Sequence, residues 1–207
     1  MTLAERFFVC AIPADGIVVS PKVPTGVGGA IVAELALAGR IRVEEEGVHA
    51  LDTTPTGDEL LDPVIAGAQD PSSQSTRASW FVANVGRAQL PKVHARVVES
   101  GLATLEKGEK RRLIGTKPDW LKPTAAGEEE RRRMRAVLLG DAEPDEREAL
   151  LAGLAAACDL VRLHVPKERR DEATRRAESL AAGEALPEHV RDAIRGSRAA
   201  VAAILNN

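Results

Sequence analysis

Ala30-Ile-Val-Ala-Glu-Leu-Ala-Leu-Ala38 is the stretch of sequence that decides the fold. Apolar side chains fill it without leaving a polar face, and Glu34 is its one charge. A helix that is apolar on nearly every side must be surrounded by other elements. Gly39 follows, in the position where a left-handed residue ends a helix. The stretch therefore predicts a buried helix at the centre of a helical bundle.

The residues before this helix predict a loop. Pro24-Thr-Gly-Val-Gly-Gly29 combines a proline with three glycines. Such a loop can cradle a phosphate at the positive end of a helix dipole. A dinucleotide fingerprint would need glycine at Ile31, however, and a P-loop would need Gly-Lys-Ser/Thr. The alternative is a plain loop whose glycines allow close packing. Upstream, Phe7 to Ile12 indicates a short buried segment, and Gly16 to Ser20 indicates a strand.

Two β-hairpins are expected downstream. Alternation at period two over Arg40 to Glu44 and Val48 to Asp52 predicts the first one. Leu102 to Leu105 and Arg112 to Ile114 predict the second, with the charged residues Glu106 to Arg111 as its tip.

The rest of the chain is predicted to be mostly helical. Thr56-Gly-Asp-Glu59 has the pattern of a capping box and predicts a helix start. Further helical stretches are expected at Trp80 to Glu99 with an interruption at Pro91, Glu128 to Leu138, Asp145 to Val165, Lys167 to Ala181 and Glu188 to Leu205. The predicted fold class is mainly α: a central helical bundle wrapped by amphipathic helices, with two short β-hairpins, and residues 1–207 forming one domain.

Composition argues against several classes of function. Aromatic residues make up 2% of the chain and tyrosine is absent, so a surface that stacks nucleic-acid bases is not expected. The two cysteines, Cys10 and Cys158, form no CxxC motif, and the four histidines are scattered. We therefore expect no metal, no cofactor and a reduced cytoplasmic protein. The longest apolar stretch, Ala149 to Cys158, is about half the length that crosses a bilayer.

The carboxylates also favour a protein that is not an enzyme. Glu34, in the apolar helix, could be a buried general base, or it could be a structural hydrogen-bond acceptor. Asp52, Asp58 and Asp62 are interpreted as turn and cap residues rather than as a catalytic set. An enzyme acting on a phosphorylated small molecule at the glycine loop is a further alternative.

Charge is distributed unevenly along the chain. The formal net charge is -3, yet between Arg87 and Lys122 nine lysines and arginines stand against four acids. Such a segment suggests a face that meets anionic lipid headgroups or another polyanion. A solvated surface of mixed charge is the alternative. The candidate lipid-binding residues are Arg87, Lys92, Arg96, Lys110, Arg111 and Arg112.

The central helix and the segment after it resemble a known family. Glu34-Leu-Ala-Leu-Ala-Gly-Arg-Ile41, followed by Thr54-Pro-Thr-Gly-Asp-Glu-Leu-Leu-Asp62, is similar to segments of the Golgi phosphoprotein 3 family at the same spacing. Val98-Glu-Ser-Gly101 and the leucine-rich run ending at Cys158-Asp-Leu160 extend the likeness, as does Ala200-Val-Ala-Ala203. The chain resembles the bacterial branch of that family.

This resemblance implies a helical fold with a projecting β-hairpin and a role without catalysis. The eukaryotic members are peripheral membrane adaptors that recognise phosphatidylinositol 4-phosphate and hold glycosyltransferases by their cytoplasmic tails. Matched position by position, their phosphate pocket falls on Val19, Gly28, Arg87 and Leu90, so that only Arg87 keeps the family's residue type. The hairpin tip, which is apolar in the family, is charged here.

These observations lead to one expected function and one alternative. The expected protein is cytoplasmic and non-enzymatic, docks on anionic phospholipid headgroups at the inner face of a membrane, and tethers the tail of a membrane protein. The alternative is a soluble helical interaction scaffold, or a homo-oligomer, that has lost phosphoinositide recognition. No nucleic-acid partner is expected in either case.

Overall fold

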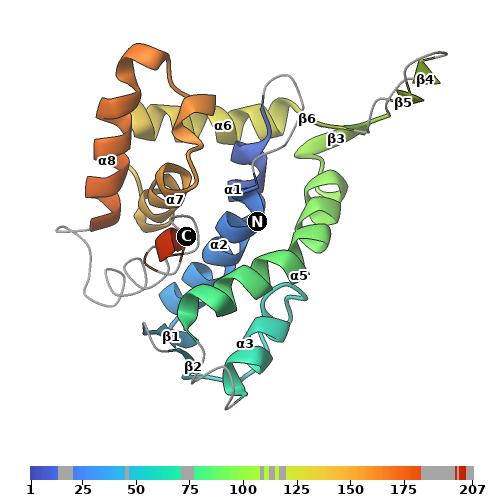
Figure 1. Cartoon of the computed structure of the whole chain (residues 1–207), viewed down its shortest axis with the longest axis vertical. Coiled ribbons are helices and arrows are strands. Elements are labelled where there is room, and N and C mark those ends of the chain that lie inside the picture. Colours follow the sequence, from blue (N-terminus) through green and yellow to red (C-terminus); the bar gives the residue numbers. More distant parts are fainter. Residues whose placement is uncertain are drawn as a thin grey trace.

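The computed structural model describes residues 1–13, 21–44, 47–70, 77–107, 110–111, 115–116, 120–182, 199 and 201–203. Helices make up most of this part of the chain, and the strands form short antiparallel pairs (Figure 1). The mainly α fold class is therefore confirmed.

The centre of the molecule is the pair of helices α1 (Leu3–Ala11) and α2 (Val23–Leu37). Three further helices pack around this pair (Figure 1): α5 (Ala78–Glu99), α6 (Ala125–Leu139) and α7 (Glu146–Ala157). Nearly all of α2 is buried, as its lack of a polar face requires. It ends just before Gly39, whose φ is +66°. The predicted central helix and its terminal glycine are confirmed.

Helix α1 was predicted only as a buried segment. It begins at a capping box, in which the Thr2 hydroxyl accepts from the Glu5 N–H at 3.2 Å and the Glu5 carboxylate accepts from the Thr2 N–H at 2.6 Å. Phe7 and Phe8 are both buried because α2, α5, α6 and α7 all contact this helix. Because α1 is packed on several sides, most of its residues are buried, and its sequence lacks the broad polar face by which a surface helix is recognised. The strand expected at Gly16 to Ser20 lies outside the described residues.

The loop expected at Pro24 to Gly29 is wrong, because these residues form the first turns of α2. Pro24 lies in the first turn, where its missing N–H breaks no helical bond. Gly28 and Gly86 lie where α2 crosses α5. A Cβ on Gly28 would fall against the carbonyl oxygen of Val82, and one on Gly86 against that of Pro24. The two glycines therefore allow the close approach of two helices.

The predicted capping box at Thr56 to Glu59 is also wrong, because helix α3 (Asp62–Gln69) begins after it. The Thr56 hydroxyl donates to the Asp62 carboxylate at 2.5 Å, and the Gly57 N–H donates to the other oxygen of that carboxylate at 3.1 Å. Asp62 thus binds the groups that a capping box would have used, and the loop folds back on the start of α3.

Helix α5 runs without a break through Pro91, so the interruption expected there is absent. Pro91 is exposed on the solvent side of the helix. The helix ends at Glu99, and Gly101 follows with a φ of +72°. The start and end predicted for this stretch hold to within two residues.

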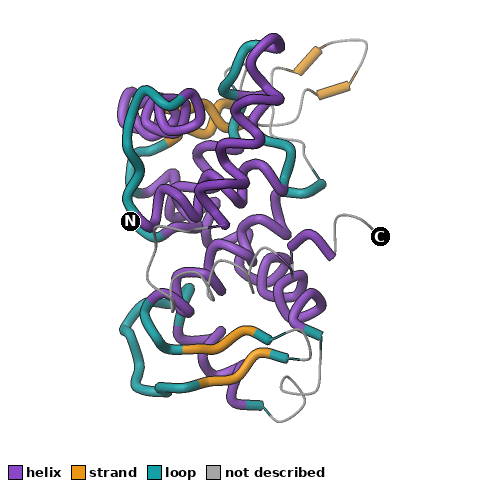
Figure 2. The backbone as a smooth tube through the Cα atoms, turned by 90° about the vertical axis from the view of Figure 1, so that its left-hand side faces the viewer, coloured by secondary structure: helices purple, strands orange, loops and turns teal. Residues whose placement is uncertain are grey.

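The first hairpin is confirmed as β1 (Ile41–Val43) paired with β2 (Val48–Ala50). The second has different partners from those expected: β3 (Ala103–Glu106) pairs with β6 (Trp120–Pro123), and β4 (Lys110–Arg111) pairs with β5 (Gly115–Thr116). Leu105 lies opposite Leu121 in this register, which gives β3 an apolar partner later in the chain than predicted. The result is a longer arm that projects from the helical body (Figure 2). The partner segment expected at Arg112 to Ile114 lies outside the described residues.

The C-terminal half is helical with shorter elements than predicted. Helix α6 ends at Leu139, one residue after the predicted end at Leu138, and Gly140 follows with a φ of +81°. The helix expected at Asp145 to Val165 ends at Ala157, and Asp159 has a φ of +60°, which a continuous helix excludes. Three short or charged helices follow: η1 (Val161–Leu163), η2 (Lys167–Arg169) and α8 (Arg170–Ala182). Of the last predicted helix, only 199 and 201–203 are described, and these residues are helical.

Candidate functional site

Helix α5 carries three of the six candidate lipid-binding residues, Arg87, Lys92 and Arg96. Its core side is formed by Phe81, Val82, Val85, Val93 and Val97, which bury it against the centre of the molecule. The opposite side therefore faces solvent, and α5 contains no acidic residue before Glu99, its last. This side of α5 is consequently a cationic face.

Two of the candidates, Arg87 and Lys92, are exposed on that face. The Arg87 guanidinium donates to the Asn84 amide oxygen at 2.5 Å, which is a contact with a neutral group one turn away. The Lys92 ammonium donates to the backbone carbonyl of Glu59 at 3.5 Å. Neither hydrogen bond neutralises the positive charge, so both side chains remain sources of positive potential.

Arg96 has a different environment from the other two. Its guanidinium pairs with Asp58 at 2.7 Å and with Glu5 at 3.4 Å, and its side chain is 24% exposed. Burial lowers the pKa of Arg96, but the hydrogen bond to Asp58 and the charge of Glu5 outweigh it and hold that pKa above its ordinary value. Arg96 thus ties α5 to α1 and to the loop before α3.

Two of the other three candidates belong to the hairpin arm. Lys110 and Arg111 form β4, where only the backbone is described, and Arg112 lies outside the described residues. The arm begins after the C-terminal end of α5, so Arg87 is separated from its base by about 18 Å of helix. The six candidates therefore do not form one compact cluster.

The phosphate pocket implied by the family resemblance is not assembled around Arg87. Gly28 lies in the crossing of α2 and α5, where a larger side chain would meet the backbone of Val82. Leu90 is half-buried and packs against the core. Val19 lies outside the described residues. Arg87 is thus the one described pocket position with an exposed cationic side chain.

The structure also decides between the alternatives left open by the glycines and by Glu34. The Gly26 N–H donates to the Lys22 carbonyl at 3.0 Å as part of α2, so it is not presented to a phosphate. One oxygen of Glu34 accepts from the Leu3 N–H at 2.8 Å, and the other pairs with Arg147 at 2.7 Å. Glu34 therefore joins three helices as a structural acceptor.

Asp52, Asp58 and Asp62 each accept a backbone N–H. Thr54 donates to Asp52 at 2.9 Å, and Leu60 donates to Asp58 at 2.8 Å. With the Asp62 bonds described above, these contacts confirm the turn and cap roles predicted for all three carboxylates.

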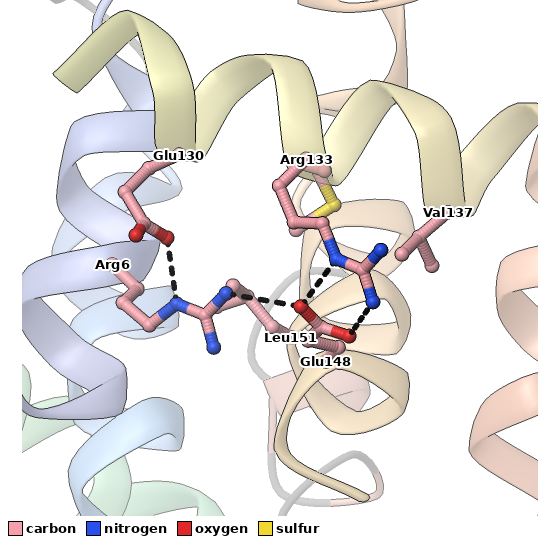
Figure 3. Close-up of a pocket in the computed structure, with 7 residues that line it drawn as sticks. Arg6, Glu130, Arg133, Val137, Glu148 and Leu151 are labelled. Carbon is pink, nitrogen blue, oxygen red and sulfur yellow. Dashed lines mark hydrogen bonds and ion pairs between the residues drawn. The ribbon is translucent and has the colours of Figure 1, made fainter. Parts of the chain in front are cut away.

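A hollow between α1, α6 and α7 holds a charge cluster that sequence reasoning missed (Figure 3). Arg6 pairs with Glu130 at 2.8 Å and with Glu148 at 3.4 Å. Arg133 binds both oxygens of Glu148, at 2.7 and 2.6 Å. The hydrogen bond from Arg133 lowers the pKa of Glu148 to about 2, so this carboxylate stays ionised and cannot serve as a general acid or base near neutral pH.

The i,i+3 and i,i+4 spacing between Glu128 to Glu130 and the arginines that follow favours ion pairs within α6. Glu128 and Glu129 form such pairs, with Arg131 and Arg132. Glu130 instead binds Arg6 on α1, 124 residues away in sequence. Only the three-dimensional fold brings such residues together, so no local spacing predicts the contact.

His164 lies in a second buried polar cluster. Its Nε2 is 2.9 Å from the Cys10 carbonyl oxygen, and Arg131 donates to the Ile12 carbonyl beside it. Burial lowers the pKa of His164 to about 4 and raises the pKa of the Cys10 thiol to about 12. A neutral imidazole and a protonated thiol without solvent access make this cluster a structural one.

The described residues also bear on two other kinds of site. No group of three or more histidine, cysteine or acidic side chains gathers there in a way that could hold a metal ion. Among the helices described, none is both long enough and apolar enough to cross a bilayer.

These features define a class: a mainly helical protein with a projecting hairpin arm, a cationic helix face and internal charge clusters that are paired. A family model for Golgi phosphoprotein 3 (GPP34) matches residues 3–196, and the chain belongs to this family. The family is Golgi-associated and is not a family of enzymes. A comparison with curated proteins found no match.

Proposed function

We propose that this protein is a non-enzymatic peripheral membrane protein that docks on anionic lipid. The observation that carries the proposal is the cationic face of α5, where Arg87 and Lys92 are exposed and no acid occurs on the helix before Glu99. A cation near an anionic surface contributes about 1 kcal/mol. Lys110 and Arg111 on the arm, and Arg112 next to them in sequence, add to the same attraction. Arg96 holds α5 in place through its ion pairs with Glu5 and Asp58.

Family membership supports this assignment and extends it. Phosphatidylinositol 4-phosphate is the ligand implied by the resemblance, and Arg87 is the pocket position that keeps the family's residue type. The protein would act at the cytoplasmic, inner face of a membrane and hold a membrane-protein tail there. Self-association would strengthen docking by presenting more than one cationic face.

A soluble interaction scaffold is the second candidate, and one observation favours it. Gly28 occupies the position of a pocket arginine, and the close crossing of α2 and α5 leaves no room there for a larger side chain. A phosphate monoester is normally held by several converging donors. Loss of the donors at Gly28 and Leu90 favours a protein that has given up phosphoinositide recognition.

Vesicle co-sedimentation distinguishes these functions. Vesicles of phosphatidylcholine alone would be compared with vesicles that carry phosphatidylglycerol, phosphatidylinositol or its 4-phosphate at matched surface charge. Equal pelleting with every anionic lipid is the expected result. Selective pelleting with the 4-phosphate would mean that a specific pocket exists, and no pelleting with any lipid would favour the soluble scaffold.

A further inference from the structure

Trp80 is exposed on the cationic face of α5, and this is unusual for the chain. Its exposed fraction is 59%, whereas Phe7, Phe8 and Phe81 are all exposed by 6% or less. Tryptophan has an apolar ring and a polar N–H, a combination that favours the boundary between water and lipid. Trp80 therefore stands apart from these buried rings as an aromatic side chain that is available to a lipid surface.

The spacing along α5 places Trp80 in line with Arg87. Residues 80, 84, 87 and 91 lie three or four positions apart and so follow one face of the helix. Trp80, Arg87 and Pro91 are exposed, and Asn84 is half-buried and holds the Arg87 guanidinium. Arg77, also exposed, precedes the helix one turn before Trp80. The ring is thus flanked by an arginine on each side.

The acidic partners identified for α5 gather at its other end. Asp58 and Glu5 bind Arg96 near the other end, and Glu59 lies close enough to act on Arg96 through its charge. No acidic residue of α5 lies near Trp80 in sequence, since the first one is Glu99. Arg77 and Arg87 therefore place positive charge on either side of the tryptophan ring, with no acid of α5 between them.

We propose that Trp80 enters the headgroup region of an anionic bilayer while Arg77 and Arg87 contact the phosphates on either side. This inference rests on the membrane docking proposed above and names the part of the protein that enters the lipid. A protein partner fits less well, because a stable interface buries about 800 Å² on each side. Beyond Trp80, the exposed apolar side chains of α5 are the small Ala88, Pro91 and Ala95, which supply little apolar area for such an interface.

Tryptophan fluorescence tests the insertion directly. The variant Trp120→Phe leaves Trp80 as the single tryptophan, and the probe is a vesicle of phosphatidylcholine with phosphatidylglycerol. Binding should shift the Trp80 emission to shorter wavelength, and lipids with bromine near the glycerol backbone should quench it. Unshifted emission from protein that pellets with the same vesicles would overturn the insertion while leaving membrane docking intact.

Substitution in the otherwise native chain gives a second readout that does not depend on changing Trp120. Trp80→Ala should lower the vesicle partition coefficient roughly tenfold, because the apolar area of the ring is no longer buried in lipid. Trp80→Phe should retain most of the binding. Both variants should melt as the native protein does, since the ring lies outside the core. Unchanged partition of Trp80→Ala would contradict the inference.

The two proposals fail in different ways. If the native protein pellets with anionic vesicles and Trp80→Ala pellets equally well, docking stands and the insertion of Trp80 is wrong. If the native protein pellets with no vesicle, both are wrong. Arg132→Glu is the matched control: Arg132 is exposed on α6, away from the cationic face, so its reversal should leave Trp80 emission and partition unchanged.

Discussion

Glu148 shows how a single residue can hold several elements together. Its carboxylate accepts from the Asp145 N–H at the start of α7, binds Arg133 on α6 through both oxygens and reaches Arg6 on α1. Its capping role can be predicted from the local spacing of Asp145 and Glu148. Its ion pairs cannot, because the partners come from distant parts of the chain.

Glu148→Gln should lower the free energy of unfolding by about 2 kcal/mol at pH 7, because Arg6 and Arg133 lose a charged partner in a partly buried site. The native pKa of about 2 lies below the ordinary 4.5. The stabilisation is therefore complete above pH 4.5 and is lost as pH falls towards 2. Urea unfolding at pH 7 and pH 3 measures the difference, with Glu129→Gln as an exposed control expected to change little. A difference that stays constant between the two pH values would contradict this role.

The lowered pKa of His164 predicts a separate loss of stability in mild acid. Its pKa is about 4 in the folded protein and about 6.5 when unfolded, so the unfolded chain takes up the proton first. Stability is full above pH 6.5 and falls as pH drops from 6.5 towards 4. Between pH 7.5 and pH 5 this amounts to about 2 kcal/mol. His164→Gln, which can still donate to the Cys10 carbonyl, should flatten that slope in urea unfolding. An unchanged slope would mean that other groups cause the acid sensitivity.

The elements show which patterns predict structure well and which do not. The helix at Ala30 to Ala38 was predicted correctly because its apolar composition indicates a buried helix and Gly39, which follows it, indicates the end of that helix. Pro24 to Gly29 was assigned to a loop because proline and glycine are poor helix formers. The structure shows that packing outweighs this propensity, since the close crossing with Gly86 requires small residues there. The strand pairing predicted for the second hairpin was wrong. Either Arg112 to Ile114 or Trp120 to Pro123 could have supplied the apolar partner of Leu105, and the structure pairs it with Leu121.

The crossing of α2 and α5 can be tested with a pair of glycine substitutions. Gly86→Ala should destabilise the protein by about 2 kcal/mol or more, because the added Cβ would meet the Pro24 carbonyl oxygen. Gly67→Ala is the matched control, since its Cβ would lie 3.7 Å from the Phe81 ring, an ordinary contact. Alanine should stabilise α3 at that position by about 0.5–1 kcal/mol. Thermal unfolding of both variants measures the contrast. Equal melting temperatures would show that α2 and α5 are less closely packed than described.

At the scale of the whole molecule, the fold decides where the charged side chains lie in space, and charges that are close in sequence become separated. The excess of positive charge between Arg87 and Lys122 could be counted from the sequence. The structure divides it into an α5 face, a paired Arg96 and a hairpin arm beyond the far end of the helix. Local spacing does not reveal that Arg96 is occupied by Asp58 and Glu5, because those residues come from other elements. The exposure of Trp80 likewise depends on which side of α5 packs against the core.

Charge reversal on α5 is the measurement that tests membrane docking most directly. Partition of the native protein, Arg87→Glu and Arg132→Glu would be measured on phosphatidylglycerol vesicles at low salt and at about 0.5 M salt, where the Debye length falls to a few Å. Arg87→Glu should bind several-fold more weakly at low salt, Arg132→Glu should bind as the native protein does, and high salt should weaken all three. Equal binding by Arg87→Glu and the native protein, unaffected by salt, would contradict docking through the cationic face.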